Sequence, residues 1–118
     1  SHAEWLQSYL PNWSQAKKNS FNNWIELDWF GTFFNALNHW NFNSTHGWFY
    51  TQYSSGESFW SWQSNQLGWW WTSRSVYPFV YSFSLGRWLY IDIEKSGFKK
   101  LVYYDYELSM WKAILYSS

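Results

Sequence analysis

One phrase of aromatic residues recurs along this chain at a nearly constant interval. Gly-Trp-Phe-Tyr-Thr at 47–51 returns as Gly-Trp-Trp-Trp-Thr at 68–72, an offset of 68 − 47 = 21 in the numbering, and Gly-Arg-Trp-Leu-Tyr follows at 86–90. A fixed period of roughly 20 residues with rings in register is typical of a repeat architecture. The period is too short for two helices and a turn, but it fits one β-hairpin per repeat. The sequence therefore predicts a series of antiparallel hairpins centred on residues 47–92.

The composition supplies a core made mainly of rings. The chain has 118 residues with 13 Trp, 10 Tyr and 10 Phe, a length that fits a single domain over 1–118. Each buried ring removes roughly 150–250 Å² of apolar surface from water, so a domain of this size needs only part of them inside. We expect the remaining rings to lie at the surface, where aromatic patches indicate contact with another molecule.

Short aromatic runs alternate with turn residues from residue 24 onward, as strands of a meander do. Before them, residues 3–10 have helical spacing and Pro11 follows, which predicts a short N-terminal helix. The polar residues 11–23 are interpreted as a connection. The strand candidates are 24–30, 50–53, 59–62, 69–72, 79–83, 88–92, 101–106 and 110–115.

A second period, about twice as long as the first, relates larger blocks. Trp40, Phe42 and Gly47 return as Phe79, Tyr81 and Gly86, since 86 − 47 = 39. The chain is therefore interpreted as two related two-hairpin units, 27–66 and 67–105, with caps at 3–23 and 106–118 that cover the end repeats. The hairpins are expected either to stack in an open series or to curl into a barrel-like roll.

Charge and cysteine content exclude several classes of function. Eight basic and eight acidic residues leave a formal net charge of zero, which gives no basis for binding nucleic acid. Cysteine is absent, so no disulfide or thiolate metal site is expected. No apolar run approaches the roughly 20 residues of a membrane-spanning helix. Phosphate-binding loops and other cofactor motifs are also lacking, and no cofactor is predicted.

The candidate binding residues are the rings in register. Their flat faces can stack on the apolar faces of sugars, while the polar neighbours bond hydroxyl groups. The competing interpretation for each ring is a place in the core, where it replaces an aliphatic residue. The seven candidates are Trp48, Trp60, Trp62, Trp69, Trp71, Trp88 and Tyr90.

The acids and histidines carry weaker signals. Asp92 with Glu94, and Asp105 with Glu107, stand at i, i+2 and would share one face of a strand, as a glycosidase pair requires. Solvated edge charges are the favoured interpretation, because strand edges need them to resist pairing. His39 and His46 match no metal motif and are interpreted as surface or turn residues. No catalytic or metal-ligating residue is predicted.

Three segments carry a resemblance to a known group of repeats. Gly-Trp-Trp-Trp-Thr-Ser at 68–73, Tyr-Pro-Phe-Val-Tyr at 77–81 and Gly-Arg-Trp-Leu-Tyr at 86–90 resemble an uncharacterised aromatic-rich repeat of marine bacterial and ocean-metagenome proteins. The resemblance covers roughly 28–111 and implies a β-rich fold without an assigned activity. The first unit departs from it, with Asn-His-Trp at 38–40 in place of Tyr-Pro-Phe.

A looser likeness connects the chain to the choline-binding and cell-wall-binding hairpin repeats of bacterial surface proteins. Trp-Leu-Tyr at 88–90 is similar to their second strand, and in those proteins rings of adjacent hairpins enclose a quaternary ammonium group. Their regular Asp-Gly turns are missing here.

These observations predict a non-catalytic binding or adhesion module, extracellular or at the cell surface, that recognises carbohydrate or a cell-surface polymer through exposed rings. The alternative is a structural repeat or assembly domain of a larger surface protein. A glycosidase-like enzyme is the remote alternative. Zero net charge together with exposed rings also favours self-association.

Overall fold

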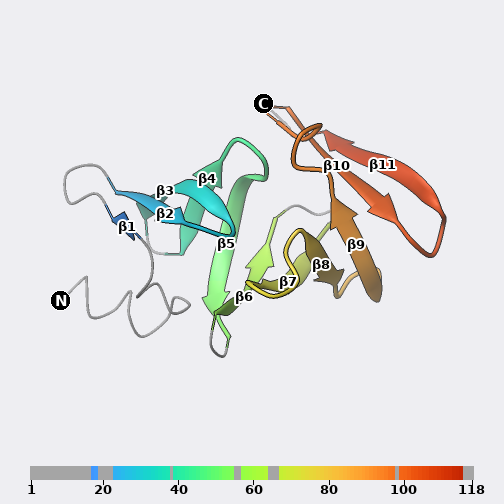
Figure 1. The fold of residues 1–118 in the computed structure, drawn as a ribbon, viewed down its shortest axis with the longest axis horizontal. Coiled ribbons are helices and arrows are strands. Elements are labelled where there is room, and N and C mark those ends of the chain that lie inside the picture. The colour runs from blue at the N-terminus through green and yellow to red at the C-terminus, as the bar shows by residue number, and fades with distance from the viewer. Residues whose placement is uncertain are drawn as a thin grey trace.

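The chain folds into one antiparallel meander. The computed structural model describes residues 17–18, 23–37, 39–54, 57–63, 67–97 and 99–115. Each strand in this part pairs with its neighbours in sequence (Figure 1). The strands are β1 (Lys17–Lys18), β2 (Trp24–Leu27), β3 (Gly31–Leu37), β4 (Trp40–Asn43), β5 (Gly47–Tyr53), β6 (Ser58–Trp62), β7 (Trp69–Ser73), β8 (Phe79–Ser82), β9 (Arg87–Ile91), β10 (Lys100–Asp105) and β11 (Met110–Leu115).

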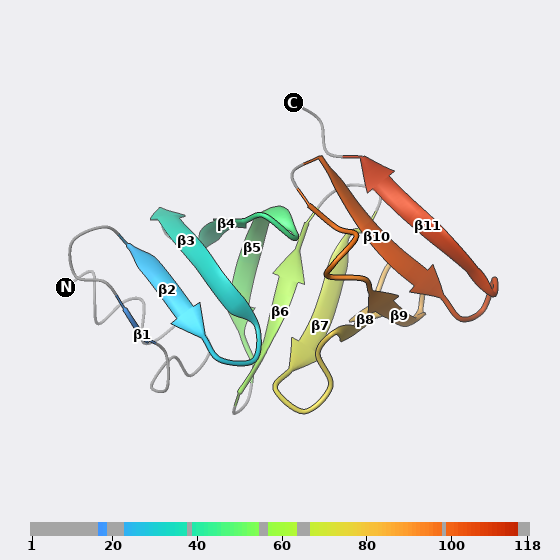
Figure 2. The ribbon, with the colours of Figure 1, turned by 45° about the horizontal axis from the view of Figure 1, so that its top comes forward.

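The predicted all-β class and antiparallel hairpins are confirmed, and the choice between an open and a closed sheet is settled. Strands β1 and β11 lie at opposite ends of the strand order, so the sheet is open and twisted (Figure 2). The closed-barrel alternative is wrong. The helix predicted over 3–10 lies outside the described residues. The described part contains no helix that could cross a membrane.

Three features of the N-terminal half differ from the prediction. Lys17 and Lys18, within the segment interpreted as a connection, form β1 and pair with β2. The candidate strand 24–30 ends at Leu27, because Asp28, Trp29 and Phe30 form a turn in front of Gly31. Strands β3 and β4 were not predicted, since the inward positions 35, 41 and 43 carry asparagine in place of an apolar residue, although Phe33 in β3 is buried.

Side-chain hydrogen bonds satisfy the buried asparagines of β3 and β4. Asn35 Nδ2 donates to Asn41 Oδ1 at 2.8 Å, and Asn41 Nδ2 donates to Thr51 Oγ1 at 3.0 Å. Buried polar groups cost free energy unless they are paired in this way. The network replaces apolar packing at inward positions, and it hides the strands from a prediction based on hydrophobic alternation.

Residues in a left-handed backbone conformation precede or open the returning strand of five hairpins. Gly31, Gly47, Gly68 and Gly86 have φ of 107°, 71°, 68° and 70°, and Ser109 has φ of 54°. Glycine adopts positive φ without a steric penalty, whereas a residue with a Cβ does not. Gly68 is further constrained, because an added Cβ would collide with the Ser84 side chain. Ser109 therefore occupies a glycine position of the repeat.

Replacement of Ser109 by glycine is expected to stabilise the fold by roughly 0.5–1 kcal/mol, because it removes the left-handed strain of a residue with a Cβ. The weak contact of Ser109 Oγ with the Tyr106 carbonyl at 3.5 Å is a small loss. Urea unfolding at equilibrium measures the change.

The matched control is Ser44→Gly, which places glycine at an exposed turn residue outside the positive-φ positions. Glycine there adds freedom to the unfolded chain and should destabilise the protein slightly. Equal effects of the two substitutions would contradict the assignment of strain to Ser109.

Side chains alternate between two faces of the sheet, as the two-residue period of a strand requires. The inner face holds buried residues, among them Phe33, Phe49, Phe59, Trp70 and Leu89. The outer face holds exposed or half-buried rings. An aromatic cluster is present in the core, but the expectation of a core made mainly of rings is wrong: of the 14 buried residues in the described core, eight are aliphatic, four are phenylalanines, and Trp70 and Tyr103 are the other two.

The distribution of tryptophan explains this difference. Among the described tryptophans, Trp70 is the buried one, and the others keep part of their surface accessible. Burial of an indole costs free energy when its N–H group finds no partner, as is the case for Trp70 Nε1 within the described residues, whereas a partly exposed ring can bury its apolar body and leave the N–H in water. The phenylalanine ring has no such requirement and suits the inner face.

The β2–β3 turn crosses the inner face and covers it. Phe30 is buried, and its ring centroid lies 5.7 Å from that of Phe49, 5.2 Å from Phe59 and 4.9 Å from Tyr77. The register between β3 and β4 shifts between Asn35 and Leu37. The turn thus reaches residues of β5, β6 and the β7–β8 connection.

An ion-pair cluster holds this turn against the β7–β8 connection. Arg74 donates to Asp28 through two nitrogens at 2.8 and 2.9 Å and also pairs with Glu57. Its hydrogen bonds hold the pKa of the Asp28 carboxyl below the ordinary value of 3.8. The groups are partly exposed, so their main effect is to fix the geometry of segments that are distant in sequence.

Candidate aromatic binding face

All seven predicted binding residues lie on the outer face. Trp48, Trp69 and Trp88 are exposed, with 51%, 37% and 41% of their surface accessible. Trp60, Trp62, Trp71 and Tyr90 are half-buried on the same side, while the residues that alternate with them are buried. The sequence prediction therefore selected one surface of the sheet.

The structure adds further rings and orders them in four rows across the strands. Each row contains one aromatic residue from each of four neighbouring strands. We call these residues together the aromatic face. The first row is Trp24, Phe34, Phe42 and Trp48; the second is Trp40, Tyr50, Trp62 and Trp69; the third is Trp60, Trp71, Tyr81 and Trp88; and the fourth is Phe79, Tyr90, Tyr104 and Trp111.

Ring pairs within the hairpins fix the orientation of the aromatic face. The centroids of Trp40 and Tyr50 lie 5.4 Å apart in a T-shaped arrangement, and those of Phe79 and Tyr90 lie 5.1 Å apart in the same arrangement. Cross-strand aromatic pairs of this kind stabilise a sheet by roughly 0.2–1 kcal/mol each. The rings are consequently held in place before any ligand arrives.

Each row ends in an exposed tryptophan at the start of a returning strand. These are Trp48, Trp69, Trp88 and Trp111, on β5, β7, β9 and β11. Trp111 was missed from the sequence, because Ser109 stands where the other hairpins have glycine. Its signal was its position two residues after Ser109, as Trp88 stands two residues after Gly86.

The aromatic face is uncharged over most of its length. From β4 to β9 its outward positions carry rings together with Gln52, Ser58 and Ser73, and no described residue at these positions is charged. Arg87, which lies in β9, belongs to the inner face, where it pairs with Asp105. Lys95 approaches the far end, with its Nζ 5.6 Å from the centroid of Trp111.

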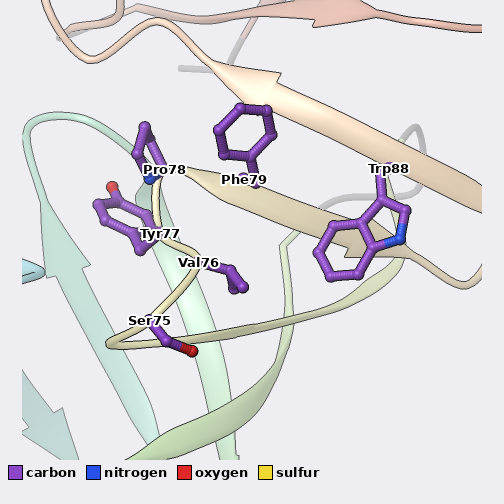
Figure 3. Close-up of a pocket in the computed structure, with 6 residues that line it drawn as sticks. All are labelled: Ser75, Val76, Tyr77, Pro78, Phe79 and Trp88. Atoms are coloured by element: carbon purple, nitrogen blue, oxygen red, sulfur yellow. The ribbon is translucent and has the colours of Figure 1, made fainter.

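A shallow groove of about 430 Å³ separates the third row from the fourth. Its lining includes Val76, Phe79 and Trp88, whose side chains surround one hollow in Figure 3. Tyr77 precedes Pro78 through a cis peptide bond, and its ring packs on the core residue Phe30. The groove presents two exposed rings and an apolar floor, a surface that suits a flat apolar group.

One acid of each predicted acidic pair in the C-terminal hairpins makes structural contacts, either with backbone amides or with an arginine. Asp105 is fully buried, so the interpretation of a solvated edge charge is wrong for this residue. Arg87 binds its carboxylate through Nε at 2.8 Å and Nη2 at 2.7 Å, which holds the pKa of Asp105 below its ordinary value of 3.8. Asp105 also accepts the amides of Glu107 and Leu108 in the following turn.

In the pair of Asp92 and Glu94, Asp92 likewise accepts a backbone amide of the following turn. Asp92 accepts the Lys95 amide at 3.0 Å in the β9–β10 turn, while Glu94 is exposed. Over the described ranges, no three or more histidine and acidic side chains gather closely enough to hold a metal ion.

His46 lies in the β4–β5 turn but is fully buried, so the expectation of a surface position is wrong for this histidine. Its ring stacks between Phe30 and Trp70, with centroids at 5.4 and 5.2 Å. Nδ1–H donates to Gln63 Oε1 at 3.1 Å, and the Tyr77 hydroxyl donates to Nε2 at 2.9 Å. Burial lowers the pKa of His46 to about 4, so the neutral form fills this core position.

Comparison of this chain with protein-family models, curated proteins and solved structures finds no significant match. The resemblance to aromatic-rich marine repeats stays a prediction. The aromatic face itself is therefore the basis for a function.

Proposed function

We propose that this protein is a non-catalytic binding module that holds carbohydrate, or another cell-surface polymer, against the aromatic face. The observation that supports it is a row-by-row array of rings with tryptophans that are 37% to 51% accessible at its exposed positions. Apolar surface gathered in this way on a small protein indicates an interaction site. The polymer would be met outside the cell, so we place the module there.

The ring geometry suits sugars. The C–H groups of a pyranose form a flat apolar face that an indole can cover, and the hydroxyls at the rim remain free for polar partners. Gln52 is exposed on the same surface, and Ser54 accepts the Trp71 indole N–H at 3.3 Å. Rings that are already ordered lose little conformational entropy when a ligand stacks on them.

Tryptophan fluorescence during titration with soluble polysaccharides, free sugars and choline tests the proposal. We expect a saturable shift with at least one carbohydrate. Trp88→Ala, which removes one wall of the groove in Figure 3, should weaken that binding about tenfold, as loss of an exposed tryptophan that anchors a ligand commonly does.

Ile93→Ala is the matched control, because Ile93 is an exposed apolar residue, 43% accessible, in the β9–β10 turn, and it belongs neither to the four rows of rings nor to the lining of the groove. It should leave binding unchanged. No shift across the carbohydrates, or an equal loss in both variants, contradicts the proposal.

Assembly is the second candidate function, and the C-terminal hairpin favours it. In the described part of the chain β11 pairs with β10 alone, and its exposed residues include Met110, Trp111 and Leu115. An edge strand with apolar side chains can pair with another chain. Concentration-dependent association in the ultracentrifuge, without carbohydrate binding, would favour this function.

A glycosidase-like enzyme remains the remote alternative. It requires two carboxylates that face each other across a cleft. Asp105 is buried and held by Arg87, and Asp92 accepts a turn amide, so each contact accounts for its acid without a catalytic role.

A further inference from the structure

The exposed tryptophans that end the first three rows, Trp48, Trp69 and Trp88, are related by one repeated displacement. Trp69 is level with Tyr50, two residues beyond Trp48, because Tyr50 pairs with Trp62 and Trp62 with Trp69. Trp88 is level with Trp71, two residues beyond Trp69, through the pairs of Tyr81. Each step thus crosses two strands and advances two residues.

The distance between neighbouring exposed tryptophans determines how long a ligand must be to contact more than one of them. Two strand spacings are about 10 Å and two residues are about 7 Å, so neighbouring tryptophans stand roughly 12 Å apart on a flat sheet. Three of them span roughly 24 Å, well within the 45 Å length of the molecule. This distance is several sugar rings long, and a single sugar contacts one tryptophan.

The absence of charge selects the chemistry of the ligand. An acidic polymer laid on this face would give up hydration without gaining a cationic partner among the described outward residues of β4 to β9. A neutral polymer suffers no such loss. Lys95 lies over the ring of Trp111, so the uncharged series of exposed tryptophans ends at Trp88.

We infer that the aromatic face binds a neutral, extended polysaccharide that runs diagonally across the hairpins and stacks separate sugar rings on Trp48, Trp69 and Trp88. The inference rests on the proposed function and specifies its ligand. Because the stacking contacts are joined by one polymer chain, each added contact raises affinity without a new bimolecular encounter.

Calorimetric titration with neutral β-linked glucan, mannan and xylan oligosaccharides, from disaccharide to octasaccharide, tests the length of the site. We expect the affinity for one series to rise at least about tenfold with length. Trp69→Ala removes the middle contact and should weaken the octasaccharide about tenfold, while the disaccharide, which can use Trp48 or Trp88, changes little. Ile93→Ala again serves as the control.

Two soluble polymers with one backbone test the charge preference. Hydroxyethylcellulose is neutral and carboxymethylcellulose is acidic, and affinity electrophoresis should show stronger retardation by the neutral polymer at every salt concentration. Equivalent neutral and acidic derivatives replace them if the oligosaccharides select mannan or xylan.

The outcomes separate the inference from the function on which it rests. Binding that is equal for disaccharide and octasaccharide overturns the inference and leaves the carbohydrate module intact. Preference for the acidic polymer, weakened by salt, overturns the neutral ligand. No binding to any carbohydrate overturns both.

Discussion

Truncation of Phe30 to alanine is expected to lower the free energy of unfolding by about 3–5 kcal/mol, the range for removal of a well-packed core phenylalanine. The side chain is 6% accessible and lies in the turn that crosses the inner face. Six rings surround it with centroids at 4.9 to 6.0 Å: Trp29, Phe33, His46, Phe49, Phe59 and Tyr77. These neighbours come from several strands and connections, so they cannot collapse together into the cavity. Urea unfolding measures the loss.

Phe34→Ala is the matched control, because Phe34 is a half-buried phenylalanine on the outer face of β3. Its loss removes the pair with Trp24 at 5.5 Å, and we expect it to cost about 1–2 kcal/mol. A Phe30 variant no less stable than the Phe34 variant would show that the β2–β3 turn does not hold the core together.

The role of Phe30 was within reach of the sequence but was not recognised. The residue before the turn glycine is Phe30, His46, Leu67 and Leu85 in successive hairpins, and each lies in or packs against the core. The prediction instead extended a strand through 24–30, because aromatic residues favour strands and the run contains no proline. The turn was signalled by Gly31 and by its place in the repeat.

Local pattern was sufficient to predict the hairpins and the aromatic face. The short repeat period matched one hairpin per unit, and alternation placed Trp60 and Trp62 on one side of β6, as the structure shows. The rows themselves could not be predicted, since they depend on the register between strands. Register follows from turn geometry and from which face is buried.

Contacts between segments that are distant along the chain could not be predicted from the sequence. Arg74 and Asp28 are 46 residues apart, and each reads as an ordinary surface charge. They meet because the sheet twists and the β2–β3 turn folds over its inner face. The burial of Asp105 and His46 has the same origin, because polar residues near turns are usually exposed, and tertiary contacts here reverse that preference.

Acidification is expected to destabilise the protein between pH 6.5 and pH 4 through His46. The ordinary pKa of histidine is 6.5, and burial lowers the pKa of His46 in the folded state to about 4. In this interval the unfolded chain takes up a proton that the folded chain refuses, so stability falls as pH falls. The pKa difference between the folded and unfolded chain corresponds to about 3 kcal/mol in the free energy of unfolding. This stability is present above pH 6.5 and is lost below the folded pKa of about 4.

The pH interval separates His46 from the carboxylates. Asp28 and Asp105 have folded pKa values below 3.8, so their contributions are lost at a lower pH than that of the histidine. His46→Gln keeps a neutral polar side chain next to Gln63 and Tyr77 but cannot take up a proton. Urea unfolding at a series of pH values should therefore give a flat profile between pH 6.5 and pH 4 for the variant and a falling one for the wild type.

The same titration also bears on the aromatic face. The His46 ring stacks on Trp70, whose strand carries Trp69 and Trp71 outward. Protonation of a ring held in this core would place a charge among apolar side chains, which favours local opening of the β4–β5 turn over a charged buried state. Because binding needs the four rows of rings in place, the affinity for carbohydrate should fall between pH 6.5 and pH 4 in the wild type. It should stay constant over the same interval in His46→Gln. If the affinity falls equally with pH in both proteins, groups other than His46 cause the acid sensitivity.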